Sequence, residues 1–236
     1  MLRLRLLTFI WVLTLSNGSF AAEPAHLFIL SGQSNMARLD AGAQFIPMVE
    51  KAFGEDRVIV VKDAQGGEPI RRWYRDWTSS DGERPEVNGD LYDRLMDKVR
   101  ARISGRHIET ITFLWMQGEN DAIAHGDVYR ESLLGLLQQL RDDLGREDIH
   151  YVIGRLSDHG IGHDKFPDWS RIREIQMDIA GASPRGAWVD TDDLNDGINR
   201  RWRWVKDDLH YTILGYRRFG IRLAETAIEL IRRNSL

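Results

Sequence analysis

Three residue types that together can hydrolyse an ester stand near opposite ends of the sequence. Ser34 follows the apolar run 27–30, and Asp207 and His210 lie three residues apart in the C-terminal part. A serine hydroxyl becomes a good nucleophile when a neighbouring base takes its proton, and an imidazole does this best when a carboxylate holds its tautomer. We therefore predict Ser34 as nucleophile, His210 as its base and Asp207 as the carboxylate that orients His210.

Each part of this prediction has a simpler alternative. A serine in a small-residue cluster often bonds its own backbone in a turn, and Asp207 and Asp208 could cap a following helix. Asp208 is also an alternative partner for His210. We favour Asp207 because positions three apart fall on the same side of a single turn, whereas adjacent residues diverge.

The hydropathy pattern predicts the elements that would bring these residues together. Apolar runs alternate with amphipathic stretches, which is typical of a parallel sheet with helices on both faces. Ser34 would then follow the first strand, at the carboxyl edge where open α/β sheets bind ligands. The predicted strands are 26–31, 57–62, 110–116, 150–153 and 186–189, and the predicted helices are 43–53, 91–102, 128–144, 169–179 and 213–233.

Acyl transfer also needs hydrogen-bond donors directed at the developing oxyanion, and two loops at the same edge offer them. Gly66 and Gly67 follow the second predicted strand, where a glycine lets a backbone N–H approach a substrate. Gln117 follows the third strand and carries a side-chain amide. A glycine pair is most often only a turn, so the prediction depends on three strand ends and one C-terminal segment converging.

Composition restricts the class of protein. The 236 residues carry a formal net charge of −4 and are 42% hydrophobic and 29% charged, which gives no electrostatic reason to bind nucleic acid or an anionic membrane. No repeat or linker divides the chain, so 23–236 is predicted to be a single domain. The absence of cysteine excludes disulfides, thiol nucleophiles and cysteine-bound metals.

The first 22 residues differ from the rest. Arg3 and Arg5 precede the apolar run 6–15, and Ser19-Phe20-Ala21 fits the small-x-small pattern of a cleavage site. The run is too short to span a membrane. We predict a cleavable signal peptide over 1–22, a secreted or periplasmic mature protein, and no stable membrane insertion after cleavage. A retained amphipathic or membrane-anchoring helix is the alternative.

Four short blocks together resemble the SGNH hydrolases, and among them the carbohydrate esterases related to sialate O-acetylesterase and to family-six acetylxylan esterases. The blocks stand in the order found in that family and extend over nearly the whole mature chain. They are Gly32-Gln33-Ser34-Asn35-Met36, Gly66-Gly67, Trp115-x-Gln117-Gly118-Glu119-x-Asp121, and Asp207-x-x-His210 followed by Gly215-Tyr216.

The resemblance implies a three-layer α/β/α sandwich with a central, mainly five-stranded parallel sheet, as in flavodoxin-like folds. It implies the triad proposed above, and an oxyanion hole formed by the backbone N–H groups of Ser34 and Gly67 with the side chain of Gln117. Many SGNH enzymes carry asparagine in the third block, so Asn120 is an alternative to Gln117, as Gly66 is to Gly67.

Other polar and aromatic groups could have supporting roles. We expect the Glu119 carboxylate to hydrogen-bond the Ser34 loop, since a second charge at the oxyanion would oppose the transition state. The loops 63–90 and 191–206 are rich in Trp and Arg, which could bind sugar or pack on the core. His159 and His163 could bind a metal, but their glycine-rich spacing offers no fixed ligand face, and no metal site is predicted.

These features predict a serine esterase that removes O-acetyl groups from carbohydrate through an acetyl-enzyme intermediate, without metal or organic cofactor. The substrate would be acetylated xylan, sialic acid or a cell-wall glycan. One alternative is an esterase or thioesterase acting on a lipid or other acyl substrate, which would need a long apolar groove for a lipid. The other is a non-catalytic carbohydrate-binding relic, which would not require all three triad residues. No feature of the sequence defines an oligomeric state.

Overall fold

The central sheet has five parallel strands in the order β2-β1-β3-β4-β5. The structure, a computed structural model, describes residues 23–235, so the predicted signal peptide lies outside the described residues. The strands are β1 (Ala25–Gly32), β2 (Val58–Ala64), β3 (Ile108–Met116), β4 (His150–Gly154) and β5 (Gly186–Val189). This order is the one found in flavodoxin-like sheets, and the predicted five-stranded sheet is confirmed.

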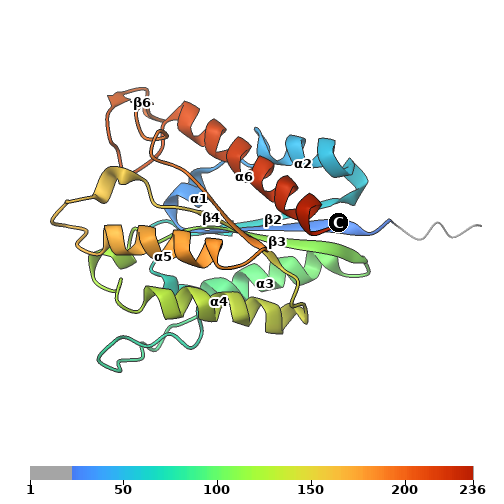
Figure 1. The fold of residues 1–236 in the computed structure, drawn as a ribbon, viewed down its shortest axis with the longest axis horizontal. Coiled ribbons are helices and arrows are strands. Elements are labelled where there is room, and N and C mark those ends of the chain that lie inside the picture. The colour runs from blue at the N-terminus through green and yellow to red at the C-terminus, as the bar shows by residue number, and fades with distance from the viewer. Residues whose placement is uncertain (1–22, 236) are drawn as a thin grey trace, which may run out of the picture.

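Helices cover both faces of the sheet, which confirms the predicted three layers (Figure 1). Helices α2 (Phe45–Phe53) and α6 (Ile213–Asn234) pack together on one face. The other face carries α3 (Asp90–Ile103), α4 (Tyr129–Leu144) and α5 (Trp169–Gly181). None of the helices between residues 23 and 235 combines the length and apolar character that a membrane span requires.

Strand burial follows strand position. Every residue of β1, which lies between β2 and β3, is buried, because helices cover both of its faces. The edge strand β2 alternates between buried and half-buried residues. The apolar run before Ser34 is therefore a rigid base for the loop that carries the hydroxyl.

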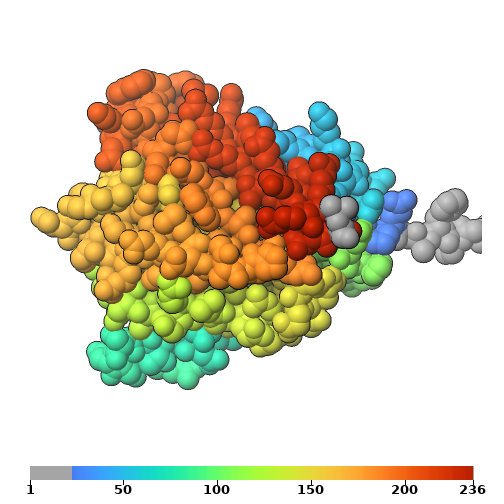
Figure 2. Space-filling model, viewed as in Figure 1, coloured from blue at the N-terminus to red at the C-terminus, as the bar shows by residue number. Residues whose placement is uncertain are grey.

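Two elements that the sequence did not predict lie at the carboxyl edge of the sheet. Helix α1 (Ser34–Arg38) begins at Ser34 itself. The second element is an antiparallel hairpin, β6 (Gly197–Ile198) and β7 (Trp204–Val205). Both are found at the same end of the molecule in Figure 1, and the hairpin segment forms part of the orange-red surface in Figure 2.

The two Trp-rich loops have different surroundings. In the loop after β2, Trp73 and Trp77 are buried, and Trp73 packs edge-on against Trp115 with ring centroids 5.3 Å apart. These tryptophans belong to the core and are not available for stacking on a sugar. On the hairpin, by contrast, Trp202 and Trp204 are 82% and 74% exposed.

Candidate active site

Ser34 is the first residue of α1 and lies at the carboxyl end of β1, as predicted from the apolar run. Its side chain is half-buried, and its hydroxyl forms no hydrogen bond with another residue of the described chain. The turn after β2 lies directly against it, since a Cβ atom added to Gly66 would stand 3.7 Å from the Ser34 Cβ. Gly67 follows with a φ of +78°, a conformation that favours glycine.

Asn35 joins the Ser34 loop to the segment that carries His210. Its amide Nδ2 donates to the carbonyl oxygen of Leu209 at 3.2 Å, and its Oδ1 accepts from the backbone N–H of Tyr211 at 3.4 Å. The residues on either side of His210 are therefore both held by the residue after Ser34. We call this arrangement the Asn35 clamp.

His210 is half-buried, with surroundings that favour the neutral imidazole. Burial and the positive charge of Arg38 lower its pKa below the ordinary 6.5, while the carboxylate of Asp208 acts in the opposite direction. Removing an imidazole from water disfavours its charged form. At neutral pH the ring is therefore ready to accept a proton.

Asp207 faces His159 in this structure. Its carboxylate Oδ1 lies 3.4 Å from Nδ1 of His159 and accepts a 3.2 Å hydrogen bond from Asn195. Its backbone is in the left-handed region, with a φ of +49°. Asp208 instead accepts the backbone N–H of His210 at 3.2 Å. Among the described residues, neither carboxylate forms an ion pair with the His210 ring.

Gln117 is completely buried, and its amide faces into the protein. Nε2 donates to Gln33 and to the carbonyl oxygen of Glu68, both at 3.2 Å, and to the carboxylate of Asp121. The Gln33 side chain in turn accepts the backbone N–H of Asn120 at 3.2 Å. Gln117 thus ties the loops after β1, β2 and β3 to one another.

Asn120 presents its amide next to the glycine turn. It is half-exposed, and Nδ2 donates to the carbonyl oxygen of Gly67 at 2.7 Å. Of the two amides considered for the oxyanion hole, the one on Asn120 is therefore the accessible one. Ser34, Gly66, Gly67 and Asn120 lie along one rim of the sheet.

Comparison with known proteins assigns the chain to a family. A family model described as carbohydrate esterase, sialic acid-specific acetylesterase matches residues 37–229, beginning just after Ser34. The chain belongs to this carbohydrate esterase family. Its SGNH-type fold, with the five-stranded parallel sheet, agrees with that membership.

Relatives of this chain differ considerably from it in sequence. A probable carbohydrate esterase of Arabidopsis thaliana is 26% identical over 164 residues, which are 67% of this chain and 55% of the relative, so the chain spans about half the relative's length. The crystal structure of that Arabidopsis protein has a TM-score of 0.64 at 20% identity, covering 87% of this chain and 98% of the other. A carbohydrate acetylesterase from Xanthomonas citri has a TM-score of 0.61 at 18% identity, covering 86% and 56%.

Two buried carboxyl groups, on Glu119 and Asp121, hold the loops that follow β1 and β2 in this esterase family member. Glu119 accepts a 3.0 Å hydrogen bond from Asn35, and Asp121 accepts the backbone N–H of Ile70 at 2.9 Å. Burial raises the pKa of each to about 7. One oxygen of each, Oε2 of Glu119 and Oδ1 of Asp121, has no hydrogen-bond partner among the described residues. Such an environment favours the protonated carboxyl.

Glu119 makes stability depend on pH. Because folding raises its pKa, the stabilisation is complete below pH 4.5 and is lost as the pH rises towards 7. The Glu119→Gln variant keeps an oxygen to accept from Asn35 but cannot titrate. Between pH 5 and 7 we expect its free energy of unfolding to fall less steeply than that of the parent protein, by about 1.4 kcal/mol per pH unit. Urea unfolding at pH 5 and at pH 7 measures this free energy. The exposed Glu131→Gln is the control, and an unchanged pH dependence in Glu119→Gln would contradict this account.

Asn35 is the functional residue whose role the sequence analysis did not predict. It occurs in the first of the family-like blocks, directly after Ser34, but nothing local shows what it contacts. Its amide has four hydrogen-bond partners, which are Glu119 in the loop after β3, Leu209 and Tyr211 on either side of His210, and Tyr216 of α6. The Tyr216 hydroxyl donates to Oδ1 at 2.9 Å. All four hydrogen-bonding positions of the amide are used.

Proposed function

We propose that the protein is a serine esterase that removes O-acetyl groups from carbohydrate. The observation that carries the proposal is the Asn35 clamp, because it holds the segment of His210 beside the loop of Ser34. The His210 imidazole has a lowered pKa that favours its neutral form. Membership of the carbohydrate esterase family supports the same chemistry.

The first half of the proposed reaction forms an acetyl-enzyme. Ser34 Oγ attacks the acetyl carbonyl carbon while His210 takes the hydroxyl proton. Negative charge that develops on the carbonyl oxygen is stabilised by the backbone N–H groups of Ser34 and Gly67 and by an amide side chain. When the tetrahedral intermediate breaks down, the C–O bond to the sugar is cleaved and the imidazolium protonates the leaving sugar oxygen.

The second half returns the protein to its starting state. A water molecule attacks the acetyl carbon, and His210 takes one proton from this water. The new intermediate releases Ser34 Oγ, which receives the proton from His210, and acetic acid leaves and loses its remaining proton to water as acetate. The lowered pKa of His210 suits both halves, because the ring must be neutral before each attack.

The surface beside His210 favours a polar substrate over a lipid. A cavity of about 450 Å³ adjoins the ring, and its lining is dominated by arginine and other polar side chains. A long acyl chain binds in an apolar groove, which this lining does not provide. The polar cavity thus supports the carbohydrate proposal over the lipid alternative.

Acetate release from a panel of substrates tests the proposed function. We expect the protein to deacetylate glycans and to hydrolyse acetyl esters about 100-fold faster than octanoyl or longer esters, because the cavity beside His210 has a polar lining. The Ser34→Ala variant is the blank for each assay. A preference for long acyl chains would reject the carbohydrate proposal, and glycan binding without any acetate release would favour the relic alternative.

We further propose that Asp207 orients His210 once its carboxylate turns from His159, since catalytic hydrogen bonds are often formed only with substrate bound. Asp207→Asn is then expected to lower kcat by about 10³-fold because the imidazole loses its oriented tautomer. Asp208→Asn is the matched neighbour, with an expected loss below about 10-fold. Rates on a small acetyl ester measure both, and a larger loss in Asp208→Asn would exchange the two roles.

Asn120 is our proposed side-chain donor to the oxyanion, because the amide of Gln117 is buried and engaged. We expect Asn120→Ala to lower kcat about 10²-fold with little change in KM, since the bond strengthens only in the transition state. Steady-state kinetics on an acetyl ester measures this. An unchanged kcat would return the role to Gln117 or to backbone donors alone.

A further inference from the structure

Three arginines surround the cavity next to His210. They come from distant parts of the chain, Arg38 from α1 and Arg200 and Arg201 from the turn of the β6–β7 hairpin. The cavity of about 450 Å³ is lined by Arg38, Asn199, Arg200, Arg201, Asp208 and His210, together with a tyrosine. The cationic side chains therefore border the proposed base directly.

These arginines have no carboxylate partner within the described chain, unlike many others in the protein. Arg72 pairs with Asp90 at 2.6 Å, for example, and Arg222 pairs with Asp193 at 2.5 Å. No ion pair involves Arg38, Arg200 or Arg201 between residues 23 and 235, and the one carboxylate of the cavity, on Asp208, accepts the backbone N–H of His210. Like charges gathered without compensation are unfavourable unless an anion joins them.

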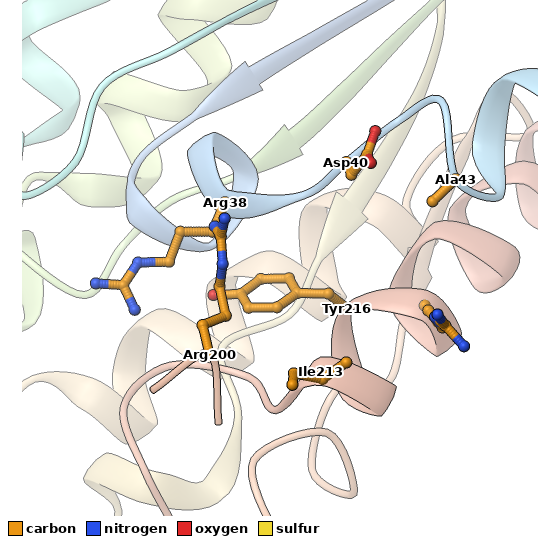
Figure 3. A pocket seen from close by; sticks show the side chains of 7 residues that line it. Arg38, Asp40, Ala43, Arg200, Ile213 and Tyr216 are labelled. Atoms are coloured by element: carbon orange, nitrogen blue, oxygen red, sulfur yellow. The ribbon is translucent and has the colours of Figure 1, made fainter. Parts of the chain in front are cut away.

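A second hollow lies beside the cavity, towards α6 (Figure 3). Its volume is about 220 Å³, and Arg38 and Arg200 line it as well as the first cavity, together with Arg217, the carboxylate of Asp40 and the apolar side chains of Ala43 and Ile213. Figure 3 shows the ring of Tyr216 pointing from α6 towards these two arginines. The two hollows share a wall, so together they form an extended surface suited to a ligand longer than one acetyl group.

The hairpin turn holds its side chains in a defined arrangement. Oδ1 of Asn199 accepts the backbone N–H groups of Arg201 at 2.9 Å and Arg203 at 3.1 Å. Trp202 adopts a φ of +59°, which is rare for a bulky residue, and is largely exposed, as Trp204 is. Large apolar rings in water beside a site are suited to stacking on a sugar face.

We propose that this surface binds a carboxylate on the acetylated glycan, with Arg38 and Arg200 contacting the carboxylate and the exposed tryptophans contacting adjoining sugar. The inference rests on the proposed function and specifies its substrate class, an acidic rather than a neutral glycan. A guanidinium matches a carboxylate in a two-pronged hydrogen bond. The shared chemistry is the sugar carboxylate, which a uronic acid or a sialic acid can supply.

Kinetics with matched substrates tests the inference. We expect kcat/KM to be at least about 10-fold higher for acetylated oligogalacturonides than for acetylated oligogalactosides of the same length, mainly through KM. The Arg38→Gln/Arg200→Gln variant should lose this preference, while Arg102→Gln, on the exposed side of α3, should keep it. Because both substrates meet the same catalytic residues, their ratio isolates the carboxylate. The kcat/KM for an O-acetylated sialic acid, set against that for the oligogalacturonide, distinguishes the two sources. The substrate with the higher value carries the preferred carboxylate.

Direct binding separates this inference from the proposed reaction. Calorimetry with Ser34→Ala should show tighter binding of the oligogalacturonide than of the oligogalactoside, with a difference that shrinks as salt rises. Acetate release at equal kcat/KM from acidic and neutral substrates would overturn the inference and leave the esterase proposal intact. A preference that persists in the double arginine variant would overturn the assignment to these residues. If the parent protein binds the acidic glycan more tightly than the neutral one but releases no acetate from either, the proposed reaction is rejected and the binding inference stands.

Discussion

Ser34→Ala is expected to lower kcat for a small acetyl ester by at least about 10⁴-fold. No other group in the proposed mechanism can form the acetyl-enzyme, so the remaining rate would come only from the oxyanion donors and from substrate binding. His210→Gln should cause a comparable loss because the serine would keep its proton. Combining the two changes should add little, since residues that act as a unit are not additive.

The fold should survive the loss of the Ser34 hydroxyl. That hydroxyl makes no hydrogen bond to the rest of the described chain, and the residue is only half-buried. Circular dichroism and urea unfolding of Ser34→Ala should therefore match the parent protein. A well-folded variant that retains its esterase rate would reject Ser34 as the nucleophile.

Gly32→Ala is expected to prevent the protein from folding. A Cβ atom at this position would lie 2.0 Å from the carbonyl oxygen of Met116, which belongs to the neighbouring strand and accepts the backbone N–H of Gln33 at 2.8 Å. The φ of Gly32 is +135°, a region open essentially to glycine alone. Because both obstacles are in the backbone of the central sheet, we expect a destabilisation above about 4 kcal/mol.

Gly145→Ala provides the matched control for backbone strain without a clash. Gly145 ends α4 with a φ of +62°, and a Cβ there would meet no atom within 4 Å. Its expected cost is about 1 kcal/mol, so this variant should fold. Soluble yield and urea unfolding compare the two. If Gly32→Ala unfolds at the same urea concentration as Gly145→Ala, the contact with Met116 is not the obstacle proposed.

The layered fold could be predicted from sequence because its signals are local and repeated. The five strands of the central sheet and the five long helices show the apolar patterns of their own segments, and their observed ends differ from the predicted ones by only a few residues. Helix α1 has five residues, and each hairpin strand has two. Segments of that length contain too few apolar positions for a period to be read.

The places of the candidate residues in the fold could be predicted from sequence, but their contacts could not. The sequence placed Ser34 and the glycine turn after strands, and both follow strands in the structure. It could not distinguish buried Trp73 from exposed Trp202, because both stand in Trp- and Arg-rich loops. Nor could it show that the Gln117 amide turns inward, since its partners lie in three loops far apart in sequence.

The Asn35 clamp joins segments that stand 174 to 181 residues apart in the sequence. Contacts at such a separation are costly to close in an unfolded chain, so Asn35 meets Leu209, Tyr211 and Tyr216 only when the sheet between them has assembled. If Ser34 and His210 react as we propose, a chain with an incomplete sheet would have the hydroxyl but no imidazole beside it. The esterase rate would then report complete folding.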